Sequence, residues 1–218
     1  CLDRMGRAFL AGVGTASAAR DMDAVRQALG EQQINYLGYS YGTELGTAYL
    51  QRFPERVRAM VLDGAIDPDQ DAIDSLVEQM AGFQLAFNDF AADCATSADC
   101  PLGTDPEKFD SRFHQLVDPL VTAPAMTADP RGLSYADAIT GTFNALYTPQ
   151  YWKYLTRGLL ALQRGTKADA LLLLADDYQG RDDDGHYSNG QDAFSAIRCV
   201  DSPTPGDPAA WAEADRRI

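Results

Sequence analysis

The sequence predicts an α/β fold, in which part of a parallel sheet carries a sharp strand-to-helix turn and is followed by a large helical insertion. Three observations lead to this prediction. Residues 17–64 read as helix, strand, helix, strand, an alternation typical of βαβ units. A Gly-x-Ser-x-Gly motif at residues 38–42 lies where the first strand passes into a helix. Helical patterns dominate beyond residue 66, and no confident strand is found between 66 and 165.

The elements of the alternating region follow from the spacing of their apolar residues. The first helix covers residues 17–29, where apolar side chains recur on one face. Residues 34–37 form a short strand. Residues 41–53 form the second helix, which Pro54 ends. Residues 57–62 (VRAMVL) are apolar enough for a buried parallel strand.

The helical patterns after this region define the insertion, and their predicted spans are 71–92, 106–121, 135–146, 149–162 and 167–177. Residues 66–107 hold ten acidic residues and no lysine or arginine, which predicts an acidic surface. We therefore divide the chain into three parts. Residues 1–65 are part of the core with the sharp turn, residues 66–198 are a helical cap, and residues 199–218 end the cap and lead back toward the core.

Composition and charge exclude several classes of function. A chain of 218 residues can form one large domain or a domain with an insertion. Its net charge of −14 argues against a nucleic-acid partner. No apolar run approaches the length needed to span a bilayer. None of the four cysteines belongs to a CxxC pair, so we expect no zinc site. The acids at 182–184 suggest a calcium loop as an alternative, but their spacing lacks the ligand pattern of an EF-hand, so we expect no metal there. The oligomeric state stays open.

The motif at residues 38–42 predicts a nucleophilic serine. In a strand-to-helix elbow, Ser40 adopts a strained backbone conformation that lifts its hydroxyl clear of the sheet. We expect a Cβ atom at Gly38 or Gly42 to collide with the neighbouring helix and strand. The backbone N–H of Tyr41 then points to where an oxyanion forms, beside the positive end of the helix dipole. The alternative is a tight turn in which Ser40 only caps the helix.

A longer stretch around this motif carries a family resemblance. Residues 19–68 combine a helix containing Asp21 and Asp23, the segment GYSYGT, and VLDG followed by DP. Residues 193–203 (AFSAIRCVDSP) contain an Ala-Ile-x-Cys-x-Asp pattern. Both stretches resemble the tripeptidyl-aminopeptidase branch of the α/β-hydrolases, secreted serine exopeptidases typical of actinomycetes. The helical middle of the chain is similar to that family only in character.

The resemblance implies a partial α/β-hydrolase core with a large helical cap. It implies a serine hydrolase that releases short peptides from free N-termini through an acyl-enzyme on Ser40, with the Tyr41 N–H as oxyanion donor. The substrate would be a peptide, no cofactor would be needed, and the protein would be secreted or associated with the cell envelope. Two alternatives stay open, an esterase or lipase on the same fold and a non-catalytic binding module that carries the cap.

The resemblance also implies a triad in the order Ser, then Asp or Glu, then His. The strands that carry the acid and the histidine are not visible, so we expect both beyond Ile218, and the chain to be the middle of a longer enzyme. His114 lies within a helical pattern. His186 follows Gly185 in an acidic stretch that we interpret as an exposed, mobile loop. We expect neither histidine to be the base.

Several acidic residues have a structural and a functional interpretation. Glu44 lies one turn beyond Ser40, where it could bind the ammonium group of a substrate or simply face solvent. Asp74 and Glu78 could bind the same group from the cap. Asp63 follows the second strand and is expected to tie the loop after it, with a role as triad acid as the alternative.

The cysteines offer a disulfide prediction. Cys94 and Cys100 bracket a polar loop, ATSAD, that a local bridge could close. Four cysteines allow three pairings, and sequence alone does not choose among them. With the resemblance to an exported family, we predict the Cys94–Cys100 bridge; free thiols in a cytosolic protein are the alternative. The partners of Cys1 and Cys199 stay open.

Overall fold

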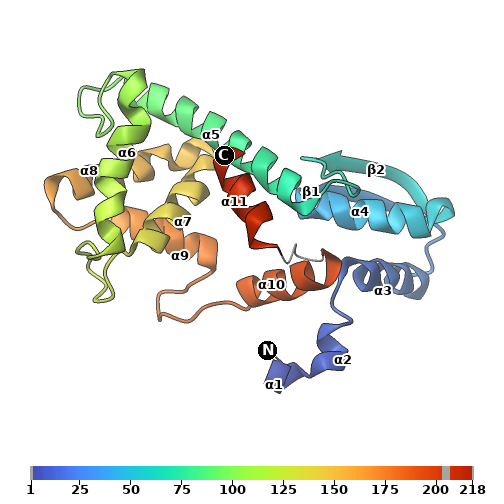
Figure 1. The fold of residues 1–218 in the computed structure, drawn as a ribbon. Helices are drawn as coiled ribbons and strands as arrows, with labels where there is room; N and C mark the ends of the chain where they lie inside the picture. Colours follow the sequence, from blue (N-terminus) through green and yellow to red (C-terminus); the bar gives the residue numbers. More distant parts are fainter. Residues whose placement is uncertain (1, 203–206, 218) are drawn as a thin grey trace. The chain divides into compact units, whose positions relative to one another are not determined.

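The fold is described by a computed structural model of residues 2–202 and 207–217, shown in Figure 1. Cys1, Pro203 and Ile218, which the sequence analysis names, lie outside the described residues. The α-helices and strands, in chain order, are α1 (Leu2–Met5), α2 (Arg7–Leu10), α3 (Thr15–Ala28), β1 (Ile34–Tyr39), α4 (Tyr41–Arg52), β2 (Val57–Asp63), α5 (Ala72–Cys94), α6 (Phe109–Val117), α7 (Tyr135–Leu146), α8 (Trp152–Arg164), α9 (Asp169–Gln179), α10 (Gly190–Asp201) and α11 (Pro208–Arg217).

The chain divides into two compact units. The first comprises the residues up to 77 together with those from 191 onward, and the second comprises residues 78–190. The boundary falls within α5, whose first residues belong to the first unit. The sequence-based boundaries after residues 65 and 198 were placed where the pattern of elements changes, and the division into core and cap stays a prediction.

The first unit contains the predicted parallel strand pair. β1 and β2 are hydrogen-bonded in parallel, with Tyr39 opposite Asp63 at their carboxyl ends. α4 connects the two strands and packs against both of them and against α3 (Figure 1). Tyr49 of α4 is fully buried, and its hydroxyl donates a hydrogen bond to the Asp23 carboxylate of α3 at 3.1 Å. The predicted βαβ unit is therefore confirmed.

The second unit is helical. α9 packs against both α7 and α8 because two glycines admit its backbone. A Cβ atom on Gly141 of α7 would lie 2.5 Å from the carbonyl oxygen of Leu171, and one on Gly158 of α8 would lie 2.6 Å from the Leu171 Cβ. Leu171 itself is completely buried at this contact. α7 begins with a reciprocal capping box between Ser134 and Asp137.

The predicted helices of the insertion are confirmed, with two differences. The helix predicted over 149–162 begins with a 3-10 turn, Pro149–Tyr151, that precedes α8. The stretch predicted as one helix over 106–121 is a 3-10 turn, α6 and a second 3-10 turn. α6 ends at Val117, because Pro119 has no N–H to continue the helix and disfavours helical geometry at Asp118 before it. Between 66 and 165 the structure has only an isolated bridge between Ala125 and Leu133 and no strand.

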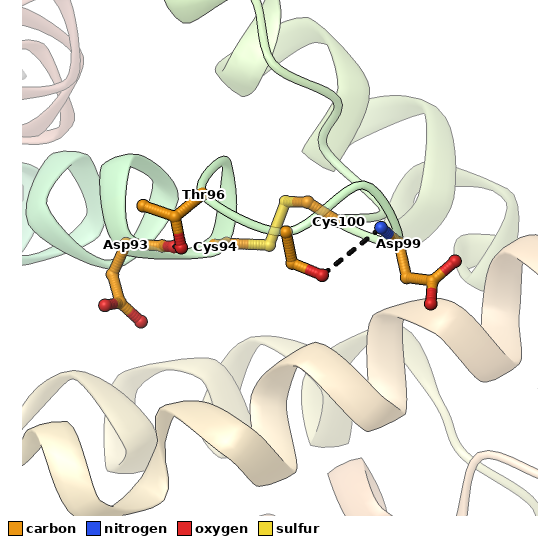
Figure 2. The surroundings of a disulfide bond; sticks show 6 residues. Asp93, Cys94, Thr96, Asp99 and Cys100 are labelled. Carbon is orange, nitrogen blue, oxygen red and sulfur yellow. Dashed lines mark hydrogen bonds between the residues drawn. A yellow bond between two sulfur atoms is a disulfide. The ribbon is translucent and has the colours of Figure 1, made fainter.

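The predicted bridge between Cys94 and Cys100 is confirmed. It joins the last residue of α5 to the turn that follows, with the two Cα atoms 5.3 Å apart (Figure 2). Within the loop, the Thr96 hydroxyl donates to the Asp93 carbonyl, and the Asp99 N–H donates to the Ser97 hydroxyl at 3.3 Å. Both cysteines are buried against the core of the second unit. The bridge therefore fixes the end of the longest helix described.

The loop between α9 and α10 is held by paired charges at its start. Arg131 and Arg181 both contact the carboxylates of Asp129 and Asp176. Arg131 also donates to the Tyr187 hydroxyl at 2.9 Å, and the Arg181 guanidinium lies over the Tyr187 ring. The predicted exposed loop is therefore tied to the second unit on both sides of its tip.

Candidate active site

Ser40 lies at the junction that the motif predicts. β1 ends at Tyr39, α4 begins at Tyr41, and Ser40 between them has φ 50° and ψ −122°. Among the described residues it is the only one other than glycine with a positive φ. Such a conformation costs about 1–3 kcal/mol and persists only where the surroundings impose it. The Ser40 residue is nevertheless exposed, so its hydroxyl is accessible.

Backbone hydrogen bonds impose this conformation. The Ser40 N–H donates to the Asp63 carbonyl at the end of β2, at 3.0 Å. The Ser40 carbonyl accepts from the Thr43 N–H at 2.8 Å and from the Thr43 hydroxyl at 2.6 Å. The same hydroxyl accepts from the Ile66 N–H at 2.9 Å. Completely buried Thr43 thus joins the elbow to the loop after β2, a role that the sequence analysis missed.

The glycines of the elbow differ in what they accommodate. A Cβ atom on Gly38 would lie 2.5 Å from the carbonyl oxygen of Gly42, so the expected collision is found there. A Cβ atom on Gly42 would meet only the Tyr36 hydroxyl oxygen, at 3.6 Å, an ordinary contact; within the described residues the expectation is wrong for Gly42. Gly46, which the motif does not include, is also required, because a Cβ atom there would lie 2.5 Å from the Tyr36 ring.

Tyr41 occupies the first position of α4, directly after Ser40. The backbone N–H groups of the first helical turn have no acceptor within the helix, so this group is available to an oxyanion. The Tyr41 side chain lies 2.6 Å, hydroxyl to hydroxyl, from Thr15 at the start of α3. The residue that carries the candidate oxyanion donor is thus held through its side-chain hydroxyl.

Of the acidic candidates near the elbow, Glu44 is partly buried in the first turn of α4. Burial, followed by the negative charge of Asp201, raises the pKa of its carboxyl group, and Arg198 acts in the opposite direction. Asp63 uses its backbone carbonyl to hold the Ser40 N–H. This contact involves only the main chain, so the two interpretations of the Asp63 side chain stay predictions.

The two acids proposed from the cap have different surroundings. Asp74, in the first turn of α5, accepts a hydrogen bond from Arg217 of α11 at 2.8 Å. Its carboxylate is therefore already paired with a cation. Glu78 is exposed on the same helix, one residue past the boundary between the units. Their predicted contact with a substrate ammonium group stays a prediction.

The two histidines lie in the second unit, and each faces a nearby carboxylate. His114 Nδ1 is 3.1 Å from an oxygen of Asp118, and His186 Nδ1 is 3.6 Å from an oxygen of Asp182. Both imidazoles are largely exposed, with 62% and 80% of their side-chain surface accessible. In residues 2–202 and 207–217 no hydrogen bond joins either of them to Ser40. The expectation that the base lies elsewhere stays a prediction.

Two searches of the described residues gave negative results. No group of three or more His, Cys, Asp or Glu side chains in residues 2–202 and 207–217 is arranged to hold a metal ion. In the same part of the chain, every helix is too short or too polar to cross a membrane.

The chain matches the model of a protein family along most of its length. The model of a family described as having the alpha/beta hydrolase fold matches residues 5–211. The matched region includes the strand pair, the elbow and nearly all of the helices described above. It therefore covers well over half of the chain.

Curated proteins from actinobacteria are similar along the whole chain. Carboxylesterase B of Mycobacterium tuberculosis is 72% identical over 218 residues, which are all of this chain and 42% of that protein. Serine protease Hip1 of the same species is 54% identical over 224 residues, covering all of this chain and 43% of the relative. Tripeptidyl aminopeptidase of Streptomyces lividans is 29% identical over 223 residues and is covered to 40%. The chain thus spans less than half the length of these relatives.

Proposed function

The chain belongs to the α/β hydrolase family, and from this premise we propose that the complete protein is a serine hydrolase with Ser40 as its nucleophile. One observation carries the proposal. Ser40 combines a positive φ of 50° with an exposed position between a parallel strand and a helix. A residue that only capped the helix would have no need of this conformation, and α4 has no side-chain cap from Ser40.

The proposed reaction follows from the groups at the elbow. The Ser40 hydroxyl oxygen attacks the substrate carbonyl carbon while a general base takes its proton. The Tyr41 N–H donates a hydrogen bond to the oxyanion of the tetrahedral intermediate. Loss of the leaving group gives an acyl-enzyme on Ser40, which water then hydrolyses. Within the described residues no hydrogen bond joins His114 or His186 to Ser40, and both imidazoles are largely exposed. We therefore assign the base and the triad acid to other residues of the complete protein.

For the substrate, we propose a peptide that is cleaved near its free N-terminus. The names of two relatives, a serine protease at 54% identity and a tripeptidyl aminopeptidase at 29%, support a peptide substrate. Glu44 offers a carboxylate in the first turn after the nucleophile, where an ammonium group would find a counterion. The ester alternative also has support, since a relative named Carboxylesterase B is 72% identical.

We further propose that the protein acts outside the cytosol, in the envelope or beyond it. The disulfide between Cys94 and Cys100 supports this location, because such bonds persist in oxidising compartments. Cell fractionation with an antibody against the protein tests the location directly. Recovery of the protein in the cytosolic fraction with both thiols reduced would contradict it.

The activity is tested with the complete protein and a fluorophosphonate, which labels activated serines. Peptide mapping of the labelled protein should identify Ser40. A panel of tripeptide anilides, the same anilides with blocked N-termini, and short acyl esters then separates the substrate classes. We expect turnover of the free tripeptide anilides alone. Preferential turnover of the esters would favour the esterase, and labelling of a different serine would overturn the assignment of Ser40.

A further inference from the structure

The N-terminus of α3 is capped by a residue far along the chain. Gly14, at the N-cap position, has no side chain to offer. Instead, the Thr15 N–H donates to the two carboxylate oxygens of Asp201 at 2.8 and 3.1 Å. A carboxylate is the favoured partner at this end of a helix. A Cβ atom on Gly14 would lie 2.5 Å from the nearer oxygen, so glycine is what lets Asp201 approach.

The side chain of Thr15 extends this contact to the elbow. Its hydroxyl donates to the Asp201 carboxylate at 2.6 Å and lies 2.6 Å from the Tyr41 hydroxyl. A threonine hydroxyl can donate only one hydrogen bond, and the Thr15 hydroxyl donates it to the Asp201 carboxylate. The Tyr41 hydroxyl must therefore be the donor toward Thr15. The result is a directed series of hydrogen bonds from Tyr41 to Thr15 to Asp201. We call this hydrogen-bond series the Tyr41–Thr15–Asp201 chain.

The Tyr41–Thr15–Asp201 chain is well shielded at its centre. Thr15 is only 5% exposed, so water competes poorly for its hydroxyl. Hydrogen bonds to a charged group are also stronger than those between neutral groups. Asp201 is the last residue of α10, the helix that begins where the second unit ends. The Asp201 carboxylate at the end of α10 is thus the acceptor that holds the Thr15 and Tyr41 hydroxyls in place.

We propose that Asp201 is a positioning residue for catalysis, which acts through Thr15 on the Tyr41 ring and so orients the Tyr41 N–H toward the oxyanion. This inference rests on the proposed function, because it requires Ser40 to form a tetrahedral intermediate. Asp201 touches neither substrate nor Ser40 in this assignment. Its effect is to hold the first peptide unit of α4, on the side of the elbow that Thr43 and Asp63 do not fix.

The decisive variant is Thr15→Val in the complete protein. It removes the hydroxyl at nearly constant volume and keeps the backbone N–H that Asp201 caps. Deleting an oxyanion donor typically costs about 10²–10³ in kcat, and a donor that is only misaligned should lose less. We expect kcat to fall about tenfold with KM changed less than about twofold, because the donor acts on the transition state. Thr15→Ser keeps the hydroxyl and should restore kcat.

A second readout separates catalysis from mere stability. A peptide boronic acid forms a tetrahedral adduct on an activated serine, and one of its oxygens occupies the oxyanion position. Its affinity should fall in Thr15→Val by about the same factor as kcat. Tyr41→Phe should have a similar effect, and the double variant should lose little more, since both changes break the same chain. Thr47→Val serves as the control, because its hydroxyl donates to the Thr43 carbonyl within α4 at 2.9 Å.

The outcomes are distinct. If Thr15→Val lowers the unfolding temperature while kcat and the boronate affinity stay at the wild-type values, Asp201 is a helix cap and nothing more. If the wild-type protein neither reacts with a fluorophosphonate nor binds the boronate, the proposed function itself fails. Asp201→Ala removes both the carboxylate that caps α3 and the last acceptor of the Tyr41–Thr15–Asp201 chain, so it should lower both stability and kcat. Should that variant not fold, the Thr15 variants still decide the question.

Discussion

Gly38 of β1 and Gly42 of α4 are in such close contact that a Cβ atom on Gly38 would lie 2.5 Å from the Gly42 carbonyl oxygen. That oxygen also accepts a hydrogen bond from the Tyr36 hydroxyl at 2.6 Å, so it is not free to move away. Gly38→Ala should therefore destabilise the protein by about 3 kcal/mol or prevent its folding. Denaturant unfolding monitored by circular dichroism measures the change.

Two glycines of α4 provide matched comparisons for that variant. Gly46→Ala places a Cβ atom 2.5 Å from the Tyr36 ring and should also destabilise. Gly42→Ala meets only an ordinary contact, and alanine favours the helix by about 1 kcal/mol. Its stability should stay within about 1 kcal/mol of the wild type. A large loss in Gly42→Ala would mean that residues other than those described press against this position.

Replacing Ser40 should abolish activity, and replacing it by glycine should also raise the stability of the protein. Ser40→Ala should lower kcat by about 10⁶, the typical cost of removing a triad nucleophile. Ser40→Gly should be equally inactive but about 1 kcal/mol more stable, because glycine adopts the φ of 50° without strain. Unfolding temperatures of the two variants, compared in the same buffer, test this. Equal stability of the alanine and glycine variants would show that the elbow stores no strain at Ser40.

The elbow could be predicted from the sequence because its determinants are local. Two glycines and a serine at fixed positions in a five-residue window, flanked by apolar patterns, identify Ser40. The disulfide was also predictable, since only the five residues ATSAD separate its cysteines. Thr43 leaves a weaker signal. It follows the motif directly and is a residue type that donates and accepts, but nothing in the sequence says that Ile66 will be its partner.

Contacts between distant parts of the chain could not be predicted. Asp201 caps Thr15 across 186 residues, and the pattern around each gives no hint of the other. Helices α10 and α11 were not predicted either. α10 does carry a signal, since Phe194, Ile197 and Val200 recur at helical spacing, whereas α11 is short and has few apolar residues. Gly14 is likewise explained only by distant residues, because a Cβ atom there would lie 2.5 Å from the Asp201 carboxylate and 2.7 Å from the Val200 side chain.

Asp23 should stabilise the first unit above pH 4 and not below pH 2. Its hydrogen bond from Arg26 is the main cause that lowers the pKa to about 2, against the effect of burial; Gln27 and Tyr49 also donate to it. A lowered folded-state pKa stabilises the protein above the unfolded value of 3.8, and this stabilisation is lost as the pH falls toward 2. Asp23→Asn should lower the unfolding temperature at pH 7.

The difference between that variant and the wild type should shrink as the pH falls from 4 to 2, because in this range the unfolded wild type binds a proton at Asp23 that the folded protein does not. Asp21→Asn is the matched control, since Asp21 is exposed on the same helix. It should leave the unfolding temperature unchanged at both ends of the range. A difference for Asp23→Asn that is constant with pH would contradict the role of its charge.

Glu44 should behave in the opposite way. Burial is the main cause that raises the pKa of its carboxyl group above the ordinary 4.5, with Asp201 adding to it. A raised pKa in the folded state means that stability is lost as the pH rises through that pKa. Glu44→Gln should therefore raise the unfolding temperature at pH 7 and have little effect below pH 4.5.

The same variant tests the proposed contact with a substrate ammonium group. If Glu44 binds that group, Glu44→Gln should raise KM for free tripeptide anilides while the protein becomes more stable. Glu55→Gln, at an exposed site after α4, is the control for both measurements. An unchanged KM together with higher stability would leave Glu44 without a role in binding.

The bridge between Cys94 and Cys100 should contribute about 2 kcal/mol to the stability of the second unit. The loop that it closes is short, and the loss of chain entropy on cross-linking grows with loop length, so the gain is at the lower end of the usual range. The double variant Cys94→Ala/Cys100→Ala keeps the buried positions apolar and removes only the cross-link. Its unfolding temperature should lie below that of the oxidised wild type and should not respond to a reductant.

Cys199→Ser, which alters an exposed thiol outside the bridge, should leave stability unchanged. If the reduced wild type were as stable as the oxidised protein, the end of α5 would be held by packing alone and the bridge would add nothing.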